Sequence, residues 1–192
     1  MLAEIAVLVT SASTLTTSTV ACRLRRQLRT DLLTGLANRV ALAAAFPRAC
    51  RRHRHHRVAV ALGDLRRFKT INDTYGHRFG DRALTAIADR LRAVTSRGEL
   101  PVRLHGDEFA VLLSGASHSE VERRVRELEE MVNRPLFIDG ILVETGLDLG
   151  VMSAPAGSAE LSALLASADD RMYGTKQSNR AHDVSTFTTE SR

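Results

Sequence analysis

The stretch VRLHGDEFAVLL (Val102–Leu113) holds two short apolar runs separated by a turn. Val102–Leu104 and Phe109–Leu113 are typical of strands, and His105-Gly106 between them is a hairpin signal. We therefore predict two antiparallel strands here. On both sides of this hairpin, strand-type and helix-type segments alternate, which is the pattern of an α+β domain.

The flanking segments complete the predicted domain. Short apolar runs predict strands, and apolar residues at helical spacing predict amphipathic helices. The remaining predicted strands are Val58–Leu62, which ends at Gly63-Asp64, and Pro135–Ile138 and Ile141–Ser153, joined by an Asp139-Gly140 turn. The predicted helices are Val40–Ala49, Phe68–Tyr75, Asp81–Val94, Ser119–Asn133 with Ser119 and Glu122 as a capping box, and Ser158–Lys176. We expect an antiparallel-rich sheet with helices packed on it.

Basic residues are concentrated in the first third of the chain. The formal net charge is +5, but residues 1–57 carry +8 and residues 58–192 carry −3. This asymmetry is typical of a membrane-surface or solvated segment rather than a nucleic-acid-reading domain. The chain has no Trp and two Tyr, which argues against a base-stacking platform, so we expect no nucleic-acid partner. The histidines of the run Arg51–Arg57 (RRHRHHR) lack partner ligands at metal spacing, which favours a solvated helix end.

Residues 1–30 are predicted to form a separate N-terminal helix. Residues 5–22 are uncharged and just long enough to cross a bilayer, and arginines follow at once, which would put the rest of the chain in the cytoplasm. Ser and Thr make up eight of the ten residues in 10–19, which fits a soluble helix equally well. The sequence therefore predicts a cytoplasmic domain and leaves its membrane anchor open. No sensor domain is recognisable, so we expect any signal to enter through residues 1–30 or a partner chain.

Three carboxylates fall next to predicted strands. Asp64 ends the first strand, and Asp107 and Glu108 follow the second. If those strands pair, the three converge at one sheet edge, where they repel one another unless a cation compensates. Hard oxygen ligands of this kind select Mg²⁺; ordinary surface turn acids are the alternative interpretation. The chain has 25 Arg and two Lys, and the retained Lys69 and Lys176 hint at phosphate binding.

Four motifs follow one another at compatible spacing. They are DLLTGLANR (Asp31–Arg39), GDLRRFKTINDTYGHRFGD (Gly63–Asp81), RLHGDEF (Arg103–Phe109) and DDRMYGTKQSNR (Asp169–Arg180). Together they resemble the GGDEF family, the diguanylate cyclase domain of bacteria. The resemblance implies that residues 31–181 form a ferredoxin-like sheet with packed helices, like the palm of nucleotidyl cyclases and polymerases. Residues 182–192 are left as a polar tail.

The resemblance also implies a reaction, in which a homodimer condenses two GTP into cyclic di-GMP and two pyrophosphates. Asp64, Asp107 and the Leu65 carbonyl would bind two Mg²⁺ ions, with Mn²⁺ as an alternative. Asp107 and Glu108 would be the catalytic residues. The residues implied to bind GTP are Arg67, Phe68, Lys69, Asn72, Asp81, Gly106, Lys176 and Arg180.

The chain departs from the family pattern at several positions. His105 replaces a turn glycine, and a positive φ there would cost about 1–2 kcal/mol. Arg66 replaces the second Asp of D-x-D, so its charge either aids GTP binding or masks the carboxylates. The R-x-x-D of the inhibitory product site reads Ser96 to Glu99, so we expect no product site. Asn179 stands where a glycine would end the last helix.

These departures leave three functional hypotheses. The first is an active diguanylate cyclase. The alternative is a catalytically degenerate GGDEF domain that binds GTP as a regulatory module, for which His105 and Arg66 are the reasons. A purely structural interaction domain is the third, and it would have no need of the acidic motifs.

Overall fold

The computed structural model describes residues 27–189, with the backbone alone at Ala116 and at residues 178–189. The segment 5–22, which was considered as a membrane anchor, lies outside these residues. Between residues 27 and 189, no helix combines the length and the apolar character needed to cross a membrane.

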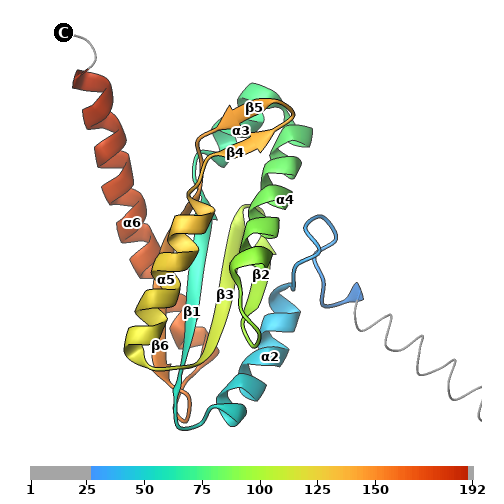
Figure 1. Cartoon of the computed structure of the whole chain (residues 1–192), viewed down its shortest axis with the longest axis vertical. Helices are drawn as coiled ribbons and strands as arrows, with labels where there is room; N and C mark the ends of the chain where they lie inside the picture. Colours follow the sequence, from blue (N-terminus) through green and yellow to red (C-terminus); the bar gives the residue numbers. More distant parts are fainter. Residues whose placement is uncertain (1–26, 190–192) are drawn as a thin grey trace, which may run out of the picture.

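A four-stranded antiparallel sheet forms the centre of the domain (Figure 1). Its strands lie in the order β2 (Leu100–His105), β3 (Glu108–Ala116), β1 (Arg57–Leu65) and β6 (Leu147–Pro155). The predicted α+β class is confirmed. The direct pairing of β1 with β2, which the sequence left as a condition, does not occur, because β3 lies between them and pairs with both.

Helices cover both faces of this sheet (Figure 1). The helices are α2 (Arg39–Arg52), α3 (Phe68–Tyr75), α4 (His77–Val94), α5 (His118–Val132) and α6 (Leu161–Thr189). Side chains alternate between the two faces of a strand, so Ala59 and Ala61 of β1 join the core under α4 and α5. Val58, Val60 and Leu62 of the same strand join the core under α2 and α6.

Several predicted boundaries are corrected. The capping box of α5 uses Ser117 and Glu120 rather than Ser119 and Glu122; both pairs have the required spacing, and the helix begins at the earlier one. The run 141–153 is two strands, β5 (Ile141–Val143) and β6. Helix α6 does not end at Lys176 or at Asn179 and continues through part of the predicted tail to Thr189.

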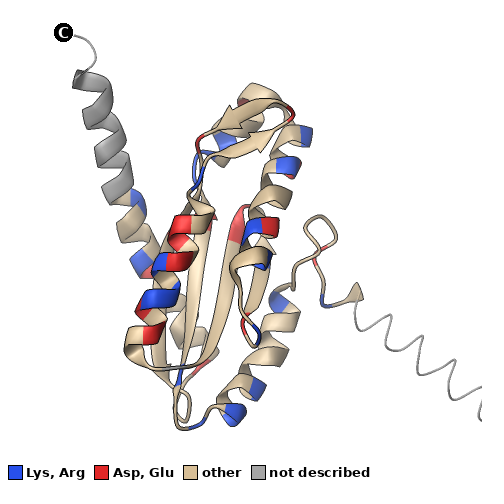
Figure 2. Ribbon diagram, in the orientation of Figure 1, with Lys and Arg blue, Asp and Glu red and all other residues tan. Residues whose placement is uncertain are grey.

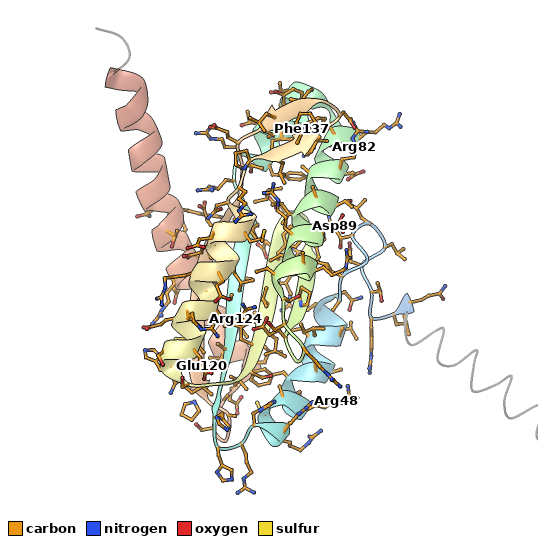
Figure 3. All side chains as sticks on the ribbon, viewed as in Figure 1. Arg48, Arg82, Asp89, Glu120, Arg124 and Phe137 are labelled. Atoms are coloured by element: carbon orange, nitrogen blue, oxygen red, sulfur yellow. The ribbon has the colours of Figure 1, made fainter. Side chains whose placement is uncertain are left out.

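The two-stranded hairpin of β4 (Leu136–Ile138) and β5 turns at Asp139-Gly140, as the sequence predicts. Both turn residues have positive φ, 51° and 81°, which is the geometry of the favoured two-residue hairpin turn. Arg82 of α4 forms an ion pair with Asp139 and ties the hairpin to that helix (Figure 3).

Asp31 anchors the segment that precedes α2. Its carboxylate accepts hydrogen bonds from the Thr34 amide at 2.8 Å and the Thr34 hydroxyl at 2.7 Å, and it pairs with the Arg103 guanidinium at 3.0 Å. Burial acts to raise the pKa of Asp31, but the contacts with Thr34 and Arg103 outweigh burial and leave this pKa below its usual value.

Replacing Asp31 with Asn should destabilise the fold in a pH-dependent way. At neutral pH we expect the free energy of unfolding to fall by about 1–2 kcal/mol, because charged hydrogen bonds become neutral ones. A carboxyl whose pKa is lowered by folding stabilises above its unfolded-state pKa, and this gain is lost as pH falls through the folded-state value. Urea unfolding of both proteins at neutral and acidic pH measures this. If the difference in unfolding free energy between the two proteins does not become smaller in acid, the stabilising role assigned to the Asp31 carboxylate is contradicted.

Candidate active site

Three carboxylates form a row across the sheet where β1 ends. The register pairs Asp64 of β1 with Glu108 of β3 on one side and with Asp148 of β6 on the other. Directly opposed residues of antiparallel strands point to the same face, which here is the face covered by α2 and α6. Asp64 and Glu108 are therefore neighbours because β3 pairs with β1. Asp148 of β6, which is buried, is a third carboxylate in this row.

Lys176 reaches this row from α6. Leu164, Ala168 and Met172 recur every fourth residue on the buried side of α6, and Lys176 continues their line past the apolar core. Asp64 likewise continues the line of Leu62 on β1. The Lys176 ammonium lies 2.9 Å from the Asp64 carboxylate.

Gly150 of β6 allows α6 to approach the sheet closely. A Cβ atom at Gly150 would lie 2.0 Å from the Ala168 carbonyl oxygen and 2.3 Å from the Met172 nitrogen. The Thr175 hydroxyl donates to the Leu149 carbonyl at 3.2 Å, and Arg171 donates to the Val151 carbonyl at 2.9 Å. These contacts fix the height and rotation of the helix and therefore the position of Lys176.

Asp107 lies in the turn beside this row. Its pKa is raised, first by burial and then by the negative charge of Asp64, while Lys176 and His105 act to lower it. The amide of Leu65 donates to the Asp107 carbonyl at 3.1 Å, which joins the end of β1 to the turn. Asp64, Asp107 and Lys176 therefore form one electrostatically coupled group.

The turn accommodates His105 without backbone strain. The non-glycine residues with positive φ between residues 27 and 189 are Arg67 and Asp139, and the left-handed position of this turn is Gly106, with φ of 50°. The energetic cost that a positive φ would impose on His105 does not arise, because the retained Gly106 adopts that conformation. The Arg103 guanidinium donates to the Gly106 carbonyl at 2.9 and 2.7 Å and braces the turn.

The His105 side chain is exposed and pairs with Glu108 rather than covering the other carboxylates. Its Nε2 lies 3.2 Å from Glu108 Oε2, and 63% of the side chain is accessible to solvent. Arg66 also points elsewhere, donating to Asn133 Oδ1 at 2.8 Å and lying 3.8 Å from the Asp148 carboxylate. Arg66 therefore does not mask Asp64, since the acid that it contacts is Asp148.

Helices α3 and α4 supply the predicted guanine-binding residues. Asn72 lies against Gly80, where a Cβ would be 1.9 Å from Asn72 Oδ1. Within the described residues, this oxygen is the buried side-chain atom that lacks a hydrogen-bond partner. Asp81 follows Gly80 and is exposed, as is Lys69 on α3. An orphaned buried acceptor of this kind points to a ligand that donates a hydrogen bond.

The backbone at the start of α3 adds potential donors. Arg67 has φ of 57° and is the N-cap of α3, so the amides of Phe68 and its neighbours have no helical partner. Arg180 lies one turn after Lys176 in α6, and its side chain falls outside the described part. Most of these residues are predicted from the sequence motifs, whereas Asp148 is not. The signal for Asp148 was a single acid within the apolar run of β6.

Glu99, one of the two positions considered for a product site, forms an internal ion pair. Glu99 accepts from the Arg124 guanidinium of α5 at 2.9 and 2.7 Å, and both side chains are nearly buried. This pairing raises the pKa of Arg124 above its usual value, chiefly through its hydrogen bonds with Glu99. Glu99 also accepts from the Ser96 amide at 2.7 Å. Its carboxylate is therefore used to hold α5 against the loop before β2.

Residues 28–182 match the family model described as diguanylate cyclase, GGDEF domain. The chain belongs to the GGDEF family. Diguanylate cyclase TpbB of Pseudomonas aeruginosa is 38% identical over 161 residues, which cover 82% of this chain and 37% of that protein. Cyclic di-GMP phosphodiesterase PdeR of Escherichia coli is 33% identical over 158 residues, covering 82% of this chain and 24% of that protein. The chain thus spans well under half the length of either relative.

A solved structure agrees with the fold. A sensory box/GGDEF family protein from Caulobacter crescentus superposes with a TM-score of 0.72 and is 34% identical, covering 78% of this chain and 99% of that one. The two proteins therefore share the fold of the sheet and its packed helices.

Proposed function

We propose that this GGDEF domain is a diguanylate cyclase that condenses two GTP into cyclic di-GMP and two pyrophosphates. The observation that carries the proposal is the gathering of Asp64, Asp107 and Lys176 at the end of β1. The relative named as a diguanylate cyclase supports it. Because each GTP must meet a second one, we propose that two copies of the domain act together as a homodimer.

A divalent cation, Mg²⁺ or alternatively Mn²⁺, fits the acidic group, and we propose two ions per site. No set of three His, Cys, Asp or Glu side chains suited to a metal gathers between residues 27 and 189. Mg²⁺ does not need one, because it keeps waters and takes phosphate oxygens as ligands. Asp64, Asp107 and the Leu65 carbonyl would hold it. The two carboxylates are close enough for the charge of Asp64 to raise the pKa of Asp107, and a cation would relieve that repulsion. When bound, the metal would neutralise charge on the triphosphate and polarise the α-phosphoryl group.

Asp107 is the proposed acceptor of the proton from the ribose 3′-hydroxyl. Its carboxylate lies beside Asp64, at the place where the attacking hydroxyl would meet the proposed metal, and a positioned carboxylate can take up a proton there. The 3′-oxygen forms a bond to the α-phosphorus of the opposite GTP. At the same time the bond breaks between that phosphorus and the oxygen that bridges it to the β-phosphorus. Pyrophosphate leaves with the electron pair of the broken bond, and Glu108 supports the centre from β3.

GTP would be held along α3 and α4. Asn72 and Asp81 accept hydrogen bonds, and guanine offers N1–H and N2–H donors that adenine lacks. The unpartnered oxygen of Asn72 supports this assignment. The remaining proposed contacts with the phosphates are the side chains of Lys69, Lys176 and Arg180 and the backbone amides of Arg67, Phe68 and Gly106.

Product analysis tests the proposal. The full chain is incubated with GTP and Mg²⁺, and mass-resolved chromatography looks for cyclic di-GMP, with Asp107→Ala as the control. We expect product from the parent chain and none from the control. Saturable GTP binding without product would overturn the cyclase proposal in favour of a regulatory GTP-binding module. The similarity to a protein named as a cyclic di-GMP phosphodiesterase is the observation that favours this second candidate.

The cyclase should show no product inhibition through the loop before β2. The carboxylate of Glu99 is engaged by Arg124, and Ser96 stands where the family has arginine. Adding micromolar cyclic di-GMP should therefore change the initial rate less than twofold. Calorimetry with cyclic di-GMP should detect no saturable binding that Glu99→Gln removes; detection of such binding contradicts the prediction.

A further inference from the structure

The end of α2, which lies at the end of the domain opposite the carboxylates, carries several Arg residues (Figure 2). We call this surface the basic end and define it by the residues at the end of α2 and in the loop to β1. It comprises Arg48, Arg51, Arg52, Arg54 and Arg57 with His53, His55 and His56. No acidic residue interrupts the run 48–57. β1 begins at Arg57 and nearly ends at Asp64, so about 23 Å of strand separates the basic end from the active site.

Most of these arginines have no structural partner. Arg57 donates to the side chain and carbonyl of Ser153. Arg48, Arg51, Arg52 and Arg54 are exposed, and within the described residues none of them forms an ion pair. Two cations near the C-terminus of α2 are explained by the helix dipole. Four unpaired guanidinium groups are more than the helix dipole accounts for, and they repel one another. The fold alone therefore does not explain them.

The basic end borders an open groove that is lined by both apolar and charged residues. The groove of about 870 Å³ lies between the end of α2 and the β6–α6 loop. Its lining combines the apolar Phe46, Ala156 and Leu161 with the charged Arg51, Arg54 and Glu160. Arginines around an apolar surface match the boundary between lipid headgroups and acyl chains. Figure 3 shows Arg48 at this same end of α2.

We propose that the basic end docks on a membrane surface rich in acidic phospholipid. The charge distribution supports this partner: residues 58–192 carry −3, so an anionic surface would attract the basic end and repel the part of the domain that follows it in the chain. The carboxylate end would then face away from the lipid. A nucleic acid fits less well, because the one aromatic side chain of the groove, Phe46, is buried and offers no stacking surface.

Vesicle sedimentation with the full chain tests this inference. The vesicles contain phosphatidylcholine alone or with a third of it replaced by phosphatidylglycerol. We expect binding that requires phosphatidylglycerol and weakens when salt is raised. Each arginine near the surface contributes roughly fivefold, so Arg51→Gln/Arg54→Gln should weaken partitioning about 25-fold. Turnover of GTP in solution should be unchanged, which separates this proposal from the proposed function.

Arg123→Gln/Arg126→Gln on α5 is the matched control, since it removes the same charge from another exposed surface. This variant should bind vesicles like the parent chain. If both variants lose vesicle binding equally, the binding depends only on the net charge of the protein, and the proposal is overturned. Unchanged binding of the Arg51/Arg54 variant would overturn it as well. So would failure of the parent chain to bind these vesicles while it binds RNA or DNA through the same arginines.

Discussion

Replacing Asp64 with Asn should reduce cyclic di-GMP formation about a thousandfold while the domain stays folded. Asp64 lies at the centre of the acidic row and contacts Lys176, and it is a proposed ligand of the metal. The substitution keeps the shape of the side chain and removes its charge. The measurement is the initial rate of product formation at saturating Mg²⁺ and GTP, with circular dichroism to verify the fold.

Asp148→Asn is the matched control for that experiment. It makes the same chemical change in the neighbouring strand, directly opposite Asp64. Arg66 already pairs with Asp148, so we expect this acid to contribute less than tenfold to the rate. A loss at Asp148 as large as the loss at Asp64 would contradict the ligand assignment and would make the whole row the metal site.

The second large effect is expected at Gly150, where even Ala should be poorly tolerated. The added methyl group would collide with backbone atoms of α6, namely the Ala168 carbonyl oxygen at 2.0 Å and the Met172 nitrogen at 2.3 Å. The helix must then move away from β6, and overpacking of this kind costs about 2–3 kcal/mol. The expected fall in melting temperature is about 5–10 °C. Lys176 moves with the helix, so product formation should fall as well.

Gly174→Ala supplies the control on α6 itself. A Cβ atom at Gly174 meets nothing within 4 Å, so the change should raise stability slightly through helix propensity. Thermal unfolding of the two variants beside the parent chain makes the comparison. Similar melting temperatures for Gly150→Ala and the parent chain would show that α6 is not held by this close approach.

Local sequence patterns predicted much of the fold because they reflect short-range chemistry. The apolar run of β1, the Asp139-Gly140 turn and helix α3 each follow from residues close together in the chain. The insertion of β3 between β1 and β2 could not be read locally, since strand order depends on long-range pairing. Helix α6 continues past Asn179 because no residue there forces the backbone to leave the helix.

The candidate site shows the same division. Asp64, Asp107 and Glu108 were identified from the motifs, and the register accounts for the contact between β1 and β3. The contact of Lys176 with Asp64 depends on how α6 packs at Gly150, which no motif states. The sequence left open whether His105 takes a positive φ, and the structure has the left-handed position at Gly106. A motif gives the residue types of a turn, and only the backbone tells which of two adjacent residues takes the positive φ.

The most direct test of the central claim is to give the full chain an equal mixture of unlabelled and uniformly ¹⁵N-labelled GTP with Mg²⁺. Joining two GTP at random predicts a cyclic dinucleotide in three mass forms, with the mixed form twice as abundant as either pure form. Two pyrophosphates should be released for each product. Formation of GDP and phosphate, or the absence of any cyclic dinucleotide, would contradict the account.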